Sequence, residues 1–325
     1  MNRKKKLLII IPTVILLLIS GGLLYVGNYL VDFAIVRSEE DPDVAPESIV
    51  SEEDASIIAT NRAKLDALSD AWIASCKTES VNITSDDGLN LVGEIYWNEQ
   101  ESHKWLIGVH GYTSSKEEYN NTGYQYAKEG YNVLLFDQRS HGESEGKYIG
   151  MGWLEKDDLL NWIDFVIEKD NQAQIILHGT SMGGATVMMT SGEALPSNVK
   201  GIVEDCGYTS VWDMFANELD YLYGLPTFPV LNAAQLVAQI RAGYNFKEAS
   251  CVEAVKKATV PMLFIHGGAD SYVLTDMVYD VYEACPTTKD ILIVEGAGHA
   301  ESYQIDPELY YNTVFNFIEE NCITE

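Results

Sequence analysis

Hydrophobic and polar residues follow three different patterns along this chain. Residues 7–30 form an uncharged, almost continuously apolar stretch. Residues 80–84 and 89–97 alternate between apolar and polar positions on either side of Asp86-Asp87-Gly88, which predicts a β-hairpin with a tight turn. From residue 105 onward, short apolar runs alternate with segments in which apolar residues recur at helical spacing.

The alternating segments predict an α/β fold built on a mostly parallel central sheet. The apolar runs predict strands at 105–109, 132–136, 174–177, 201–203, 262–265 and 291–294. Helical spacing is found at 117–129, 154–168, 182–192, 275–284 and 307–320, and one or two further helices are expected within 48–76. Such strands require helices on both faces of the sheet, with the hairpin adding antiparallel strands at one edge. Ligands of such sheets bind beyond the carboxyl ends of the strands.

One interval interrupts this alternation. Residues 206–258 are rich in aromatic side chains and contain at least two stretches with helical spacing. Because the interval begins at the carboxyl end of a predicted strand, we expect a helical lid over the ligand-binding edge. Additional helices packed on the edge of the sheet are the alternative interpretation.

The N-terminal apolar stretch is long enough to cross the roughly 30 Å hydrocarbon core of a bilayer. Basic residues at 3–6 precede it and an acidic segment at 39–43 follows it, so we expect a single-pass anchor with a cytoplasmic N-terminus and an extracytoplasmic domain. A cleaved signal peptide is the main alternative, although its apolar region would be shorter and Ser20-Gly21-Gly22 is a weak cleavage site. A buried core helix is disfavoured by the basic flank.

These patterns divide the chain into a tip and anchor at 1–37, an acidic linker with two prolines at 38–47, and a domain at 48–325. The formal net charge is −28, which makes nucleic acid a poor partner and is expected to hold the domain off an anionic bilayer. The five cysteines have no metal-ligand spacing, and we assign no disulfide among them. Their oxidation state and the oligomeric state are left open.

A candidate nucleophile lies in the sequence HGTSMGGA, which directly follows the predicted strand at 174–177. The pentapeptide from Gly179 to Gly183 fits G-x-S-x-G, a weak motif alone but a specific one between a strand and a helix. Glycines permit the tight turn that projects Ser181 at the N-terminus of the following helix, where backbone N–H groups favour negative charge.

A serine hydroxyl needs a general base, and the chain offers six histidines. His299 follows the last predicted strand in a glycine-rich loop and is the preferred base. His141 lies in another loop at the same edge and is the alternative. We expect His103 to be exposed, His178 to pack in the core, and His110 and His266 to brace loops.

The base in turn needs a carboxylate that fixes its tautomer and stabilises the imidazolium. Asp270 follows the strand at 262–265 and is the preferred residue, while Glu204 and Asp205 are its rivals. The order Ser181, Asp270, His299 is the one expected for this triad on this type of sheet. Backbone N–H groups of Met182 and Tyr112 are the candidate donors of an oxyanion hole.

The segments HGYTSSKEEY, FDQRSHGES, HGTSMGG, HGGAD and GAGHA together resemble the signatures of the α/β-hydrolase superfamily over residues 80–320. The sequence is most similar to membrane-anchored bacterial serine hydrolases and to the serine aminopeptidase-like branch. This resemblance implies Ser181, Asp270 and His299 as the triad, with Tyr112 and Met182 as oxyanion donors. The early loop has fewer glycines than the HGGG form of some esterases, so their properties are not carried over.

The expected activity is hydrolysis of a carboxylic ester with a small or medium acyl group through an acyl-serine, rising from acid towards mildly alkaline pH. Peptide or amide cleavage is the alternative, and a non-catalytic surface binding protein is a third possibility of a different class. No metal or organic cofactor is implied. Five aromatic residues are candidates for an acyl pocket or for core: Tyr112, Trp153, Tyr208, Trp212 and Phe215.

Overall fold

The computed structural model describes residues 3–38 and 50–323. A central sheet of eight strands has the order β1-β2-β4-β3-β5-β6-β7-β8. The hairpin strands pair antiparallel and join the sheet through an antiparallel β2–β4 contact, whereas all later neighbours are parallel. The strands are β1 (Lys77–Thr84), β2 (Asn90–Trp97), β3 (Lys104–Val109), β4 (Asn132–Phe136), β5 (Gln174–Thr180), β6 (Val199–Asp205), β7 (Met262–Gly267) and β8 (Lys289–Val294).

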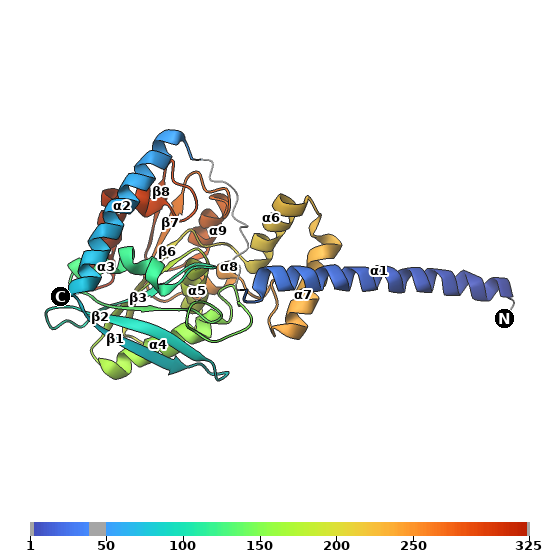
Figure 1. The fold of residues 1–325 in the computed structure, drawn as a ribbon, viewed down its shortest axis with the longest axis horizontal. Helices are drawn as coiled ribbons and strands as arrows, with labels where there is room; N and C mark the ends of the chain where they lie inside the picture. The colour runs from blue at the N-terminus through green and yellow to red at the C-terminus, as the bar shows by residue number, and fades with distance from the viewer. Residues whose placement is uncertain (1–2, 39–49, 324–325) are drawn as a thin grey trace.

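Helices cover both faces of this sheet (Figure 1). One face carries α3 (Asn120–Lys128) and α11 (Pro307–Asn321), with α2 (Glu52–Ser75) packed outside α3. The other face carries α4 (Glu155–Lys169), α5 (Met182–Ser191), α8 (Cys251–Val255) and α9 (Asp276–Ala284). The mostly parallel, doubly covered sheet predicted from the sequence is therefore confirmed.

Element boundaries differ from the predicted ones mainly at the carboxyl ends of strands. β5 continues to Thr180 and β6 to Asp205, beyond their apolar runs. The polar residues Glu204 and Asp205 are accommodated at the end of β6 because they accept hydrogen bonds from the Gly207 N–H and the Tyr310 hydroxyl. The predicted helix at 117–129 begins as a 3₁₀ turn, η1 (Lys116–Tyr119), before α3.

The N-terminal apolar stretch forms α1 (Arg3–Ile35), a helix of 33 residues. Its segment Ile10–Ile35 has a mean hydropathy of 2.2 and is long and apolar enough to cross a membrane, a test that a signal sequence also passes. Figure 1 shows the first part of this helix projecting away from the sheet domain. All but the first residue of the expected linker at 38–47 lies outside the described residues.

The last turns of α1 pack into the domain, whereas a separate tether was expected. Val31 and Ile35 are buried, and the Ile35 carbonyl accepts a hydrogen bond of 2.8 Å from the N–H of Ile149. The Arg37 guanidinium donates to the carbonyl oxygens of Gly142 and Ser144. A uniformly apolar segment gives no sequence signal for a protein-facing side, so this docking could not be predicted.

The interval 206–258 contains α6 (Val211–Tyr223), α7 (Thr227–Arg241) and α8. Figure 1 shows α6 and α7 beside α1, away from the strands. A Cβ atom on Gly27 would lie 2.7 Å from the carbonyl carbon of Ala233, so glycine is what lets α1 approach α7 this closely. An ion pair of 2.6 Å between Arg241 and Asp32 also joins the two helices.

Candidate active site

Ser181 lies in a strained turn between β5 and α5. Its φ of 58° and ψ of −119° place a non-glycine residue in a conformation that is rarely populated. The flanking glycines make the turn possible, because a Cβ on Gly179 would lie 2.1 Å from the Gly183 carbonyl oxygen. A Cβ on Gly183 would lie 2.0 Å from the carbonyl oxygen of Val109. The backbone therefore projects the serine hydroxyl from the sheet edge.

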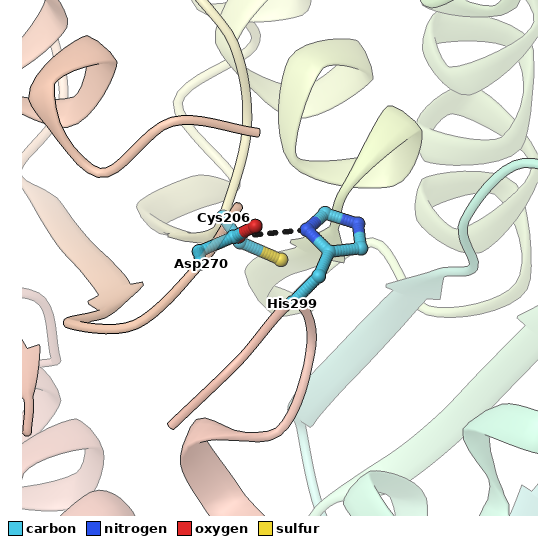
Figure 2. Close-up of side chains that lie close together, drawn as sticks. All are labelled: Cys206, Asp270 and His299. Carbon is cyan, nitrogen blue, oxygen red and sulfur yellow. Dashed lines mark hydrogen bonds and ion pairs between the residues drawn. The ribbon is translucent and has the colours of Figure 1, made fainter. Parts of the chain in front are cut away.

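His299 bridges this hydroxyl and a carboxylate. Its Nε2 lies 2.8 Å from Ser181 Oγ, and its Nδ1 lies 2.8 Å from Asp270 Oδ2. The loops after β7 and β8 bring Asp270 and His299 together, as Figure 2 shows. If Nδ1 donates its proton to Asp270, Nε2 is left to accept the serine proton, which is the geometry of a nucleophile and its base.

Asp270 is held in the ionised form. Burial acts to raise its pKa, but the charge of His299 and hydrogen bonds from His266 and His299 outweigh burial and bring the pKa to about 2. Its Oδ1 also accepts 3.0 Å hydrogen bonds from the N–H groups of Tyr272 and Val273. These contacts fix the carboxylate and keep it negative, as a partner of an imidazolium must be.

The two rival carboxyl groups have raised pKa values, unlike Asp270. Burial raises the pKa of Glu204 to about 8 and that of Asp205 to about 6. Glu204 accepts from the N–H of Gly207 at 3.0 Å, and Asp205 accepts from the Tyr310 hydroxyl at 2.9 Å. Glu204 is therefore largely neutral at pH 7, and the recorded hydrogen bonds of both side chains go to groups other than His299.

The other histidines have structural partners. His178 is buried between the hydroxyl groups of Tyr126 and Tyr310, and His103 is half exposed against Asp170. His141, the alternative base, accepts from the Thr113 N–H through Nε2 and contacts the Arg139 carbonyl through Nδ1.

A loop after β3 lies against the serine. A Cβ on Gly111 would be 3.4 Å from Ser181 Cβ, so the chain at Gly111-Tyr112 passes close to the hydroxyl. Met182, the other expected donor, is the first residue of α5, and the first N–H groups of a helix have no partner within that helix. His110 braces the loop by accepting the Gln138 N–H at 3.0 Å, and burial lowers its pKa to about 3, which keeps it neutral.

Ser181 and His299 open into a cavity of about 580 Å³. Sequence reasoning missed several of its lining residues, including Arg62 from α2 and Gln304 from α10 (Ser302–Ile305). The Arg62 guanidinium donates to Gln304 Oε1 at 2.9 Å. No local motif marks these residues, because their position depends on how α2 packs across the domain.

Cys206 is a further neighbour that the sequence did not indicate. Donor atoms of Cys206, Asp270 and His299 all lie within 4.8 Å of one another (Figure 2). These are metal-binding atom types, but Asp270 and His299 already bond to each other. Burial also raises the pKa of the Cys206 thiol well above its usual value, so the thiol is protonated in the metal-free protein. We assign no metal to this group.

The five aromatic candidates for an acyl pocket separate into two groups. Tyr112 and Phe215 line a narrow apolar cavity beside α1. Tyr208 is buried with its hydroxyl bonded to the Met151 carbonyl, and Trp153 and Trp212 pack against the core. The five cysteines, whose oxidation state the sequence left open, are free thiols in the structure.

Comparisons with known proteins agree with this architecture. A model of the serine aminopeptidase family, S33, matches residues 100–222. The YqkD protein of Bacillus subtilis is 33% identical to this chain over 191 residues. The match covers 58% of this chain and 63% of YqkD, which is less than two thirds of the length of YqkD. The Pyrococcus furiosus esterase Pf2001 is 26% identical with a TM-score of 0.62, over 77% of this chain and 94% of that one. Pyrococcus horikoshii acylaminoacyl peptidase shares the fold, with a TM-score of 0.57 and 18% identity. The match covers 76% of this chain and 42% of the peptidase.

Proposed function

We propose that this chain, which has the α/β-hydrolase fold, is a serine esterase acting through Ser181, His299 and Asp270. The observation that carries the proposal is the position of His299, 2.8 Å from both the serine hydroxyl and an ionised carboxylate. The family model and the similarity to Pf2001 support a hydrolase of esters or peptides. The ester preference rests on the esterase Pf2001, which is similar to this chain over most of its length.

In the proposed reaction, His299 Nε2 removes the Ser181 proton as the oxygen attacks the ester carbonyl. The resulting oxyanion lies against the N–H groups of Met182 and Tyr112. His299 then gives the proton to the departing alcohol, leaving an acyl-serine. Water, deprotonated by the same imidazole, attacks the acyl group and releases the acid, which restores Ser181. Asp270 stabilises the imidazolium in both halves of the cycle.

The peptidase alternative has its own support. The family model that matches residues 100–222 describes serine aminopeptidases. Glu118 and Glu301 line the same cavity as Ser181, and a carboxylate there suits the ammonium group of a peptide substrate. The two activities differ in the leaving group, because an amine requires better-placed proton delivery than an alcohol.

A direct test compares the full-length chain with its Ser181→Ala variant on p-nitrophenyl butyrate and an aminoacyl p-nitroanilide. Ester turnover that the substitution abolishes supports the esterase. Serine-dependent turnover of the anilide alone moves the assignment to a peptidase. If neither compound is turned over and a fluorophosphonate does not label the protein, the chain is a binding protein that has kept the fold.

We also propose that residues 1–37 anchor the enzyme in the cell membrane, with the N-terminus in the cytoplasm and residues 48–325 on the other side of the membrane. Within this domain, we propose that residues 206–258 form a lid over the ligand-binding edge of the sheet. The basic residues before the apolar helix favour this orientation. Protease added to intact cells should then remove the domain while the first residues remain protected. Protection of the whole chain would contradict the orientation, and release of the domain without protease would indicate cleavage after a signal sequence.

A further inference from the structure

A narrow apolar cavity is lined by the end of α1 together with α6 and α7. Its volume is about 70 Å³, far smaller than the roughly 580 Å³ of the cavity at Ser181. Apolar side chains from all three helices form its wall, among them Leu30, Phe33, Phe215, Leu219, Leu222 and Leu231. A small cavity with an apolar wall of this kind suits an alkyl chain better than a polar group.

One acidic residue, Glu218, also lies in the wall. Its Oε2 is buried without a hydrogen-bond partner among the described residues, and burial raises its pKa to about 7. Below that pH the wall is therefore mostly uncharged, which is compatible with an apolar occupant.

The two cavities share two residues, Tyr112 and Tyr272, which line both. The Tyr272 ring lies 5.0 Å from the His299 ring, measured between centroids. Tyr112 belongs to the loop against Ser181, and its hydroxyl donates to the Ala34 carbonyl of α1 at 3.0 Å. The narrow cavity is thus adjacent to the cavity that contains the reacting groups, and these two tyrosines line both.

The same three helices carry apolar side chains on their outer surface. Phe228 is 76% exposed and Ile240 is 75% exposed on α7, and Tyr25 is 76% exposed on α1. Tyr25 lies within the segment of α1 that is apolar enough to span a bilayer, and α7 packs against α1. Exposed apolar side chains with tyrosines beside such a segment are typical of the membrane interface.

We propose that the cavity between α1, α6 and α7 is the acyl-chain subsite, and that the substrate is an amphiphilic ester with one long alkyl chain drawn from the bilayer. The polar part of the ester occupies the larger cavity that contains Arg62, while its chain passes Tyr112 and Tyr272 towards α1. The inference rests on the proposed function and replaces the small or medium acyl group expected from the sequence. The anchor helix is then part of the substrate-binding site as well as a membrane attachment.

The test measures kcat/KM for p-nitrophenyl butyrate and p-nitrophenyl laurate with the full-length chain in phosphatidylcholine nanodiscs. Leu30→Trp fills the cavity from α1. The matched control is Leu17→Trp on the same helix, because Leu17 is 66% exposed and far from the cavity. Leu222→Trp fills the cavity from α6, in case the first variant does not fold. Thermal unfolding identifies the folded variants.

The wild-type protein should prefer the laurate ester. Either cavity variant should lower the laurate-to-butyrate ratio of kcat/KM by about tenfold or more, because the new ring would displace about two methylene groups of the chain from the cavity. Leu17→Trp should keep the wild-type ratio. A wild-type preference for the butyrate ester would overturn the subsite, and so would cavity variants with the same laurate-to-butyrate ratio as Leu17→Trp. In either case, turnover that depends on Ser181 would leave the proposed function standing. Turnover that survives Ser181→Ala would overturn both.

Discussion

The Tyr112 hydroxyl donates a 3.0 Å hydrogen bond to the carbonyl oxygen of Ala34. This bond joins the loop that passes beside Ser181 to the last turn of the helix that is apolar enough to span a membrane. This apolar helix and the candidate site are therefore adjacent parts of one structure. Any truncation that removes α1 also removes one wall of the cavity beside the site.

Removing that bond should cost stability. Tyr112→Phe keeps the ring and the backbone N–H but loses the hydrogen bond, and we expect the free energy of unfolding to fall by about 1 kcal/mol. Denaturant titration in detergent measures the change. Tyr279→Phe is the matched control, because Tyr279 is exposed on α9. Equal stability of the two variants would mean that the bond between α1 and the loop contributes nothing.

Asp270 should be required for catalysis in its ionised form. Asp270→Asn keeps the size of the side chain but removes the negative charge that holds the His299 tautomer, so kcat should fall about 10³- to 10⁴-fold. Steady-state hydrolysis of p-nitrophenyl butyrate measures the loss. Glu204→Gln replaces a rival carboxyl group that is largely neutral at pH 7, and should retain activity within about tenfold. The reverse ranking would assign the carboxylate role to Glu204.

Burial of Glu204 should make the protein less stable as pH rises. The pKa of this residue is raised by burial from 4.5 to about 8, so between these values the folded state holds a proton that the unfolded state has lost. The contribution of Glu204 to the free energy of unfolding therefore falls as pH rises through that window, by about 1.4 kcal/mol per pH unit, and levels off above it. Glu155, with a pKa raised to about 7 by burial, acts in the same direction.

Denaturant titrations between pH 5 and 8 test this contribution. Glu204→Gln should flatten the pH dependence relative to the wild-type chain, because the amide does not titrate. Asp270 works in the opposite direction, and its contribution is lost only as pH falls from 3.8 towards 2, outside the range measured. An unchanged slope in the variant would show that Glu204 ionises normally.

The turn at Ser181 should not tolerate a side chain at Gly183. A Cβ there would overlap the Val109 carbonyl oxygen at 2.0 Å, and the next nearest atoms are also backbone atoms of Val109 and His110, which cannot move aside as a flexible side chain could. We expect Gly183→Ala to lower the free energy of unfolding by about 3 kcal/mol and to reduce fluorophosphonate labelling. Gly21→Ala in α1 has open space around the new Cβ and serves as the control. Equal stability of the two variants would contradict the close approach of β3 and α5.

Much of this architecture could be predicted because it depends on local sequence. Continuously apolar runs gave β3 to β8, and the hairpin followed from Asp86-Asp87-Gly88. The glycines around Ser181 indicated the turn, since few other residues fit there. Loops after neighbouring parallel strands meet at one edge, so the pattern also indicated that Ser181, Asp270 and His299 lie close together. Their chemical roles remain predictions.

The features that could not be predicted depend on packing between distant segments. The apolar stretch at 7–30 has no polar side, so it gave no sign that Val31 and Ile35 would be buried against the domain. Arg62 reaches the cavity only because α2 crosses to α10, a contact between residues far apart in the sequence. Cys206 lies beside Asp270 because β6 and β7 are neighbours in the sheet, whereas its spacing in the sequence carries no motif.

The most direct measurement for the central claim is mass spectrometry of the full-length chain after reaction with a fluorophosphonate. We predict one adduct, located on the peptide that contains Ser181, and its loss in both Ser181→Ala and His299→Ala. The first substitution removes the nucleophile, and the second removes the base 2.8 Å from it. An adduct on a different residue, or labelling of Ser181 that persists without His299, would contradict the proposed mechanism.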